Sequence, residues 1–444
     1  MQFRAIADIG AELRDGRTTA ATLVDDCLAA IAARNDELNA FVLVRDAEAR
    51  AEARGADEGL ADGEDRGPLH GIPIALKDLI DLKGTPTTAA SRPLLANVAR
   101  ADAPIVTRLC DADAVIVGKC NLHELAFGTT GEESAFGMTR NPFARDRSAG
   151  GSSSGSAVAV ATGMAVAAIG TDTGGSIRIP ASACGVVGLK PTHGEVSLEG
   201  VVPLAPSLDH AGPIARTVED AATIFRIIRD DDVGDDIPEP PARPRLGIPR
   251  RYFFDLVEPA VEAAFDAAVA RLESGGVAVR GTDIAGAEET TSVYARTQRS
   301  EAFRCHAKLL ERHAADISPG VRERLESGRS VADDDYGRAQ ERRKVLAAAV
   351  DAALAGCDAL LLPTLPILPP PIGAETVELD GRDEPVRPLM LRLTQLFDVT
   401  GHPAISIPCG DAGGVPVGLQ LVGRRGETDR LLALAAAWEG VIRE

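Results

Sequence analysis

The sequence lacks the residue patterns that bind nucleic acid bases or metal ions. Phe, Trp and Tyr make up only 3% of its 444 residues, which leaves few rings on which bases could stack. Its 7 cysteines include no Cys-x-x-Cys pair, and its 7 histidines show no His-x-His or His-x-x-x-His spacing. Scattered single thiols are typical of a reducing compartment. We therefore expect a cytoplasmic protein with no metal site and no cofactor.

Positive charge and long apolar runs are scarce as well. The formal net charge is −19 at pH 7, which argues against nucleic acid or an anionic membrane as a partner. The least polar run, residues 157–169, is too short to cross a bilayer. Arg4, Asp8 and Glu12 interrupt the N-terminal region, so no secretory signal is expected. These absences favour a small-molecule substrate and leave a homodimer open.

Apolar runs of strand length alternate with helical patterns, which predicts an α/β fold: three α/β/α layers with a large mixed central sheet. We expect one domain over residues 1–444, with a helical N-terminal cover (1–65), a catalytic core (66–225) and a substrate-pocket segment (282–390). The segment 201–213 reads as a proline-punctuated loop, and 230–241 as an acidic, solvated loop. The expected strands are 72–76, 114–119, 164–170, 246–248, 277–280, 359–362, 404–408 and 417–422, and the expected helices include 102–112, 154–162, 258–273 and 427–440.

Residues 147–193 are the most informative stretch. Two glycine–serine clusters, GGSSSGS and TDTGGS, flank an uncharged run of small residues. A serine-rich turn is expected to cap the helix 154–162. The following strand opens into Thr173, Gly174, Gly175 and Ser176, where glycines allow backbone N–H groups to converge on one point. A serine at the end of such a turn can attack a carbonyl while the N–H groups stabilise the oxyanion, so Ser176 is the candidate nucleophile.

Three other interpretations compete for these clusters. A flexible linker would not lead into an apolar run, and no Gly-Lys-Ser/Thr follows to make a phosphate-binding loop. Residues 151–155, GSSSG, also fit the G-x-S-x-G nucleophile elbow with Ser153 central. That class needs a downstream histidine, for which His193, His210, His306, His313 and His402 are available. The elbow leaves the second cluster unexplained.

The run GGSSSGSAVAVATGMAVAAIGTDTGGSIRIPASACGVVGLKPT resembles the amidase signature family, serine hydrolases that cleave amide bonds with a Ser–cis-Ser–Lys triad. The upstream stretch GIPIALKD, residues 71–78, is similar to the family's lysine motif. The resemblance implies Lys77 as base, Ser152 as bridging serine and Ser176 as nucleophile. It extends from about Ile6 to Trp438, and departs at Ser154, where the family usually has glycine.

The same resemblance implies that the N–H groups of Thr173, Gly174, Gly175 and Ser176 bind the oxyanion. It also implies that residues 127–130 line the acyl pocket. His123, in a turn nearby, is expected to be structural, because a base must first show the right geometry.

The amino-acid composition supports the assignment of Lys77 as the base. Only six of the 47 basic residues are lysine. A desolvated lysine can lose its proton near neutral pH, whereas arginine does not. A lysine retained in an arginine-rich chain is therefore informative, although an ion pair with Asp78 would explain it too.

These residues predict a hydrolase that cleaves a small amide to a carboxylic acid and ammonia or an amine through a serine acyl-enzyme. One alternative is the glutaminase (A) component of a tRNA-dependent amidotransferase, which HELAFGTTGEESAFGMTRNP resembles. Against it, the chain looks short, and His210 stands where such proteins usually have glutamine. The other alternative is a catalytically silent binding protein. The substrate itself is not readable from the sequence.

Overall fold

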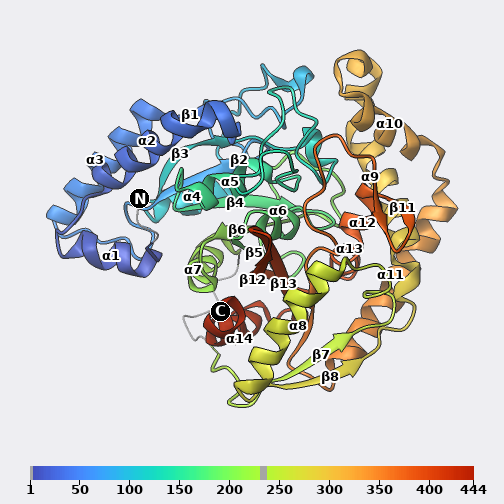
Figure 1. Ribbon diagram of the computed structural model, residues 1–444. Helices are drawn as coiled ribbons and strands as arrows, with labels where there is room; N and C mark the ends of the chain where they lie inside the picture. The colour runs from blue at the N-terminus through green and yellow to red at the C-terminus, as the bar shows by residue number, and fades with distance from the viewer. Residues whose placement is uncertain (1–3, 231–237) are drawn as a thin grey trace.

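The computed structural model describes residues 4–230 and 238–444. It contains an eleven-stranded mixed sheet in the order β1-β3-β2-β4-β6-β5-β12-β13-β9-β7-β8, and a separate two-stranded hairpin, β10–β11. Helices surround the large sheet, with α1–α3 at one end and α9–α11 at the other (Figure 1). The predicted α/β class with a large mixed central sheet is confirmed.

The strands of the large sheet are short and mostly buried. They are β1 Phe41–Val44, β2 Pro73–Lys77, β3 Val115–Cys120, β4 Ala167–Asp172, β5 Val187–Lys190, β6 His210–Ala215, β7 Arg245–Pro249, β8 Ala278–Thr282, β9 Ala359–Pro363, β12 Ala404–Ala412 and β13 Val415–Val422, and the hairpin strands are β10 Thr376–Leu379 and β11 Arg382–Pro385. β2 is parallel to both β3 and β4, whereas β5, β6, β12 and β13 pair antiparallel with their neighbours.

The helices lie between and around these strands. They are α1 Ile6–Arg14, α2 Ala20–Leu38, α3 Asp46–Ala61, α4 Pro104–Asp111, α5 Ser154–Thr162, α6 Arg178–Ala183, α7 Val218–Ile228, α8 Pro259–Ser274, α9 Thr290–His313, α10 Pro319–Ser327, α11 Asp333–Leu354, α12 Val386–Leu391, α13 Gln395–Val399 and α14 Thr428–Arg443. Short 3₁₀ turns cover Arg92–Leu94, Glu124–Ala126, Ala287–Glu289, Ala314–Asp316 and Gly328–Ser330.

Two local predictions from the sequence are wrong. The end of the loop expected over 201–213 is β6, which pairs with β4 and β5 in the interior of the sheet. Its prolines suggested a break, but His210 and Ala211 are buried and pair with β4 as part of the strand. Ser153 is the N-cap of α5, yet its side chain makes no capping bond and instead donates to the Thr171 carbonyl. The acidic loop expected at 230–241 falls largely outside the described residues.

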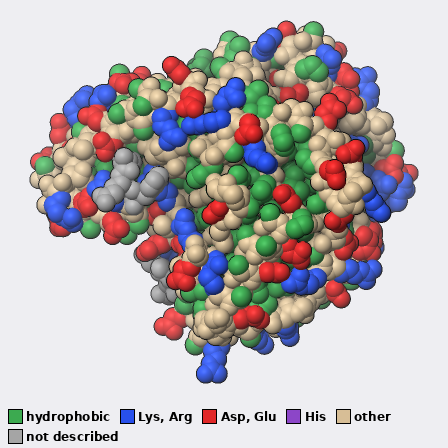
Figure 2. Space-filling model, in the orientation of Figure 1, with side chains coloured by type: hydrophobic (Ala, Val, Ile, Leu, Met, Phe, Trp, Pro, Cys, Tyr) green, Lys and Arg blue, Asp and Glu red, His purple; other side chains and the backbone are tan. Residues whose placement is uncertain are grey.

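The surface is mixed in charge. Figure 2 shows acidic and basic side chains interspersed over one face, with apolar side chains gathered near its centre. Within residues 4–230 and 238–444, no helix combines the length and the low polarity needed to cross a bilayer.

Candidate active site

Lys77 ends a strand whose five residues are all buried, and its own side chain has no exposed surface. Its Nζ donates to Ser152 Oγ and to Thr171 Oγ1, both at 2.8 Å. No carboxylate in the described part of the chain forms an ion pair with it; Asp78, the partner weighed from the sequence, pairs with Lys119 at 3.0 Å. Burial lowers the pKa of Lys77 to about 7, against the opposing pull of Asp172 and Asp209. A lysine with that pKa is partly neutral at pH 7 and can accept a proton.

Ser152 lies in the turn before α5, after a cis Gly151–Ser152 peptide bond. Its hydroxyl faces Lys77, and its carbonyl accepts a hydrogen bond from the His123 N–H at 3.1 Å. The neighbouring Ser153 hydroxyl donates to the Thr171 carbonyl at 3.1 Å and accepts from the Thr171 N–H at 3.3 Å. These bonds tie the serine turn to the end of β4, so Ser152 and Lys77 are held in one place.

Ser176 lies in the tight turn between β4 and α6. Its carbonyl accepts from the Ser153 N–H at 3.2 Å, which joins the two glycine–serine clusters. Ser176 is 5% exposed, whereas Lys77 and Ser152 are completely buried, so Ser176 is the one of the three that a substrate can reach. No hydrogen bond joins the Ser152 and Ser176 hydroxyls among the described residues. Such contacts often tighten only when substrate is bound.

The turn 173–176 differs in one respect from the expected oxyanion site. Gly175 has φ +136°, and its N–H donates to Asp172 Oδ1 rather than pointing to a vacant position. In the part of the chain that the structure describes, no acceptor is present for the N–H groups of Thr173, Gly174 and Ser176. A Cβ on Gly174 would lie 2.3 Å from the Tyr294 hydroxyl, so only glycine fits there. Three of the four expected donors therefore stay available for an oxyanion.

A buried ion network supports this turn. The Arg178 guanidinium donates to both oxygens of Asp172 at 3.0 Å and to Asp398 at 2.7 Å, and Gln420 Oε1 accepts a further bond at 3.2 Å. All four side chains are completely buried. Although burial opposes ionisation, Arg178 holds the pKa of Asp172 well below its usual range. Asp172 in turn accepts from the N–H of Ile177 at 3.0 Å, which fixes the start of α6.

We expect Arg178→Met to lower the free energy of unfolding by about 3–5 kcal/mol, because it leaves Asp172 and Asp398 buried without their cation. Urea denaturation followed by circular dichroism measures the change. The control Arg250→Met breaks exposed pairs with Glu262 and Asp266 and should cost less than about 1 kcal/mol. Equal effects of the two substitutions would contradict the role of the network.

Another completely buried lysine, Lys190, lies close to this network. Lys190 Nζ donates to the His402 carbonyl at 2.6 Å and lies 3.1 Å from His210 Nε2. Burial lowers its pKa to about 7 and lowers the pKa of His210 well below its usual range. The sequence did not predict roles for Arg178, Lys190 and their acidic partners. His210 was noted as one of the histidines available to a nucleophile-elbow enzyme, and as the residue that stands where amidotransferase A components usually have glutamine.

The competing serine interpretation is not supported by the geometry. The Ser153 hydroxyl is occupied by the Thr171 backbone, and no histidine of the described residues contacts it. His123, expected to be structural, pairs with Glu133 at 3.1 Å, and burial lowers its pKa to about 4. Gly128, Thr129 and Thr130, expected near the acyl pocket, line a cavity of about 790 Å³.

Comparison with known proteins gives consistent results. The Amidase family model matches residues 22–432. The A component of glutamyl-tRNA(Gln) amidotransferase from Roseiflexus sp. (strain RS-1) is 38% identical, and the match covers 98% of this chain and 96% of that protein. A solved structure described as an amidase is 40% identical, with a TM-score of 0.94 over 99% of this chain and 100% of that one. The solved A component of the Thermotoga maritima amidotransferase is 34% identical, with a TM-score of 0.78 over 95% and 91%.

Proposed function

Because this chain belongs to the amidase family, we propose that it hydrolyses the C–N bond of an amide through an acyl-enzyme on Ser176. The observation that carries this proposal is the lysine without a carboxylate partner, Lys77, 2.8 Å from Ser152 Oγ and with a pKa lowered to about 7. The other buried lysine of this region, Lys119, is paired with a carboxylate, Asp78, at 3.0 Å, whereas Lys77 faces hydroxyl groups, and perturbed groups of this kind concentrate at functional sites.

The proposed reaction moves one proton along the triad in each step. Neutral Lys77 accepts the proton of Ser152, and Ser152 accepts the proton of Ser176 as Ser176 Oγ attacks the amide carbon. The N–H groups of Thr173, Gly174 and Ser176 stabilise the oxyanion. Ser152 then protonates the departing nitrogen and takes back the proton held by Lys77, and the C–N bond breaks, leaving an ester on Ser176. Water attacks that ester by the same relay, releases the carboxylic acid and restores the three side chains.

Two settings for this chemistry follow from the relatives. Similarity to proteins named as the A component of glutamyl-tRNA(Gln) amidotransferase favours glutamine as the amide, with the ammonia passed to partner proteins. The chain covers 96% of such a relative, so its length is no objection to this role. The 0.94 TM-score to a structure described as an amidase favours a free-standing enzyme. Our first candidate is the glutaminase component of an amidotransferase, and our second is the free-standing amidase.

Ammonia release from a panel of primary amides separates the two. The panel contains glutamine, asparagine, succinamate, glutaramate, butyramide and a peptide amide, with Ser176→Ala as the blank. For a glutaminase component we expect release from glutamine that rises at least about tenfold when the other amidotransferase components and tRNA are added. For a free-standing amidase, release by the isolated chain is unaffected by them. No release under any condition, together with no labelling of Ser176 by a fluorophosphonate, would contradict the proposed function.

A further inference from the structure

The cavity beside the serine turn contains a group that the proposed triad does not use. Its volume is about 790 Å³, and it lies between residues 128–133, the start of α10 and the start of α12. This is the size range of small-molecule sites. Its most notable wall residue is Arg387, at the second position of α12.

Two sets of contacts place this cavity next to the triad. The backbone N–H of His123, a residue of the cavity wall, donates to the Ser152 carbonyl at 3.1 Å. A Cβ on Gly151 would lie 3.2 Å from the backbone nitrogen of Thr130, another wall residue. On the other side, Arg387 donates to Gln298 Oε1 at 3.0 Å, and Gln298 donates to the Tyr294 hydroxyl, which abuts Gly174. The wall of the cavity therefore contacts the Ser152 turn directly and reaches the proposed oxyanion turn through Gln298 and Tyr294.

The guanidinium of Arg387 is not neutralised by any acid that the structure describes. Its contacts are the amide oxygen of Gln298 and the ring of Phe127, 5.5 Å from the ring centroid. Arg324 approaches the same ring at 5.7 Å, but it already pairs with Glu133. Two cations therefore meet at Phe127, and only Arg324 has a carboxylate partner. The charge of Arg387 is available to a ligand.

Unpartnered polar atoms gather around the same space. Four buried side-chain atoms of the cavity lack a hydrogen-bond partner among the described residues: His123 Nδ1, Thr129 Oγ1, Arg324 Nε and Arg387 Nε. His123 and Thr129 are each only 4% exposed. Leaving such groups unpaired costs free energy, and both arginine atoms are donors. The wall is therefore complementary to a ligand that supplies acceptor oxygens.

The acids of the cavity do not compete for Arg387. Glu133 accepts from His123, Arg324 and the Gly320 N–H, and Glu132 accepts from the Gly373 N–H at 3.0 Å. Glu323, Glu326 and Glu375 are exposed and lie at the rim. Burial and the cationic neighbours Arg324 and Arg299 lower the pKa of Arg387 to about 10, which still leaves it charged at neutral pH.

We propose that Arg387 binds a carboxylate on the acyl portion of the substrate, so that the preferred substrates are amides whose acyl group also carries a free carboxylate. This inference rests on the proposed function and narrows it to one substrate class. Arg387 offers the fixed fork of donors that matches a carboxylate, and Thr129, whose hydroxyl has no partner among the described residues, lines the same cavity. Glutamine satisfies this requirement, and so do simpler monoamides of dicarboxylic acids.

The test compares each acid with its neutral counterpart. We measure kcat/KM for succinamate and glutaramate, for their methyl esters and for butyramide, in the wild type, Arg387→Met and Arg387→Lys. The wild type should prefer each acid over its ester by about 10–100-fold, the range that a charge-assisted hydrogen bond supplies. In Arg387→Met, kcat/KM for the acids should fall by that factor, whereas kcat/KM for the neutral amides should change less than about threefold. Arg387→Lys should give kcat/KM values for the acids between those of the wild type and Arg387→Met.

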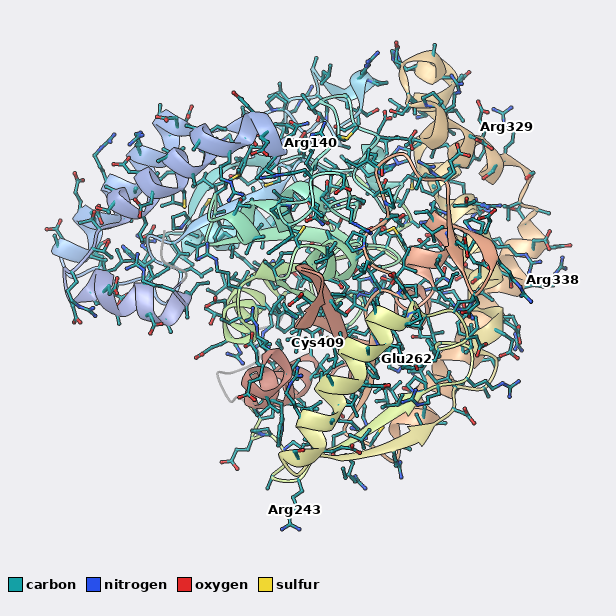
Figure 3. All side chains as sticks on the ribbon, in the orientation of Figure 1. Arg140, Arg243, Glu262, Arg329, Arg338 and Cys409 are labelled. Atoms are coloured by element: carbon teal, nitrogen blue, oxygen red, sulfur yellow. The ribbon has the colours of Figure 1, made fainter. Side chains whose placement is uncertain are left out.

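Arg338→Met is the matched control, because Arg338 is exposed on α11 and, among the described residues, pairs with Asp335 alone, three residues away. Figure 3 shows its side chain at the periphery of the molecule, and its loss should leave all rates unchanged. Equal activity of the wild type on acids and esters, or an equal loss on both in Arg387→Met, would overturn the proposal.

A binding measurement keeps this inference separate from the proposed reaction. In Ser176→Ala, millimolar succinate or glutarate should raise the midpoint of thermal unfolding, and Ser176→Ala/Arg387→Met should lose that shift. If the wild-type chain hydrolyses none of the amides, the proposed function is wrong. A rise in the unfolding midpoint that is lost with Arg387 would still support the carboxylate site. An active enzyme whose Ser176→Ala form shows no shift, or a shift that survives Arg387→Met, would overturn the carboxylate site alone.

Discussion

Ser176→Ala is expected to lower kcat by roughly 10⁴-fold or more, as loss of the nucleophile does in other serine hydrolases. Ser176 is the one member of the proposed triad with exposed surface, and alanine removes the oxygen that is proposed to form the acyl-enzyme. Burst kinetics with a chromogenic ester and mass spectrometry of the trapped acyl-enzyme measure the effect. The substitution deletes one small atom at the surface of a turn, so the protein should remain folded.

Ser153→Ala is the matched control, because it also removes a serine hydroxyl from the glycine–serine clusters. Among the described residues, the Ser153 hydroxyl bonds to the backbone of Thr171 alone, so its loss should reduce the rate by about tenfold at most. The nucleophile-elbow interpretation expects the reverse order. Near-normal rates in Ser176→Ala with an inactive Ser153→Ala would contradict the triad.

Lys77→Met is expected to lower kcat by about 10²–10⁴-fold at pH 7, the usual contribution of a positioned base. The base acts in its neutral form, and the pKa of Lys77 is lowered to about 7. The wild-type rate should therefore rise as pH increases through about 7 and level off above it. In Lys77→Met the rate should no longer rise as pH increases through about 7. The difference in kcat between the variant and the wild type should become smaller at high pH, because hydroxide can then accept the proton.

Lys190 also has a pKa lowered to about 7, so the pH profile alone does not identify the base. The comparison of Lys77→Met with Lys344→Met controls for loss of a lysine, because Lys344 is exposed and pairs with Glu341 on the surface. Thermal unfolding controls for loss of structure. A Lys77→Met enzyme that keeps the wild-type rise in rate near pH 7 would show that another group is the base.

The sequence predicted the strand that delivers Lys77, its neighbour and the helix after the serine turn well because their signals are local. The runs at 72–76 and 114–119 lie within one residue of β2 and β3, and 154–162 matches α5. Lys77 and Ser152 are 75 positions apart in the chain and meet only in the folded structure. The family resemblance implied this contact, whereas the periodicity of apolar residues did not predict it. The use of residues 173–176 as an oxyanion site and the single-domain organisation stay predictions.

The supporting groups were missed because their chemistry depends on burial. Arg178, Asp172 and Asp398 look like ordinary surface charges in a sequence with 25% charged residues, and only the fold shows that all three are inaccessible to solvent. One usable signal was present: the scarcity of lysine that singled out Lys77 applied equally to Lys119 and Lys190, and both are buried. Arg387 carried no such signal among so many arginines.

The order of strands in the large sheet has a consequence for how the protein matures on the ribosome. β12 and β13 are near the end of the chain but lie in the middle of the sheet, where β12 pairs with β5 and β13 with β9. The part of the sheet formed by β1–β6 and the part formed by β7–β9 therefore share no backbone hydrogen bonds until β12 and β13 have been made, which requires translation to pass Val422. Until then β5 has an unpaired edge, which is a site for misassembly. Gln420, which accepts a hydrogen bond from Arg178 beneath the proposed oxyanion turn, arrives with β13, so the network that supports the proposed site is completed only when the two parts of the sheet are joined.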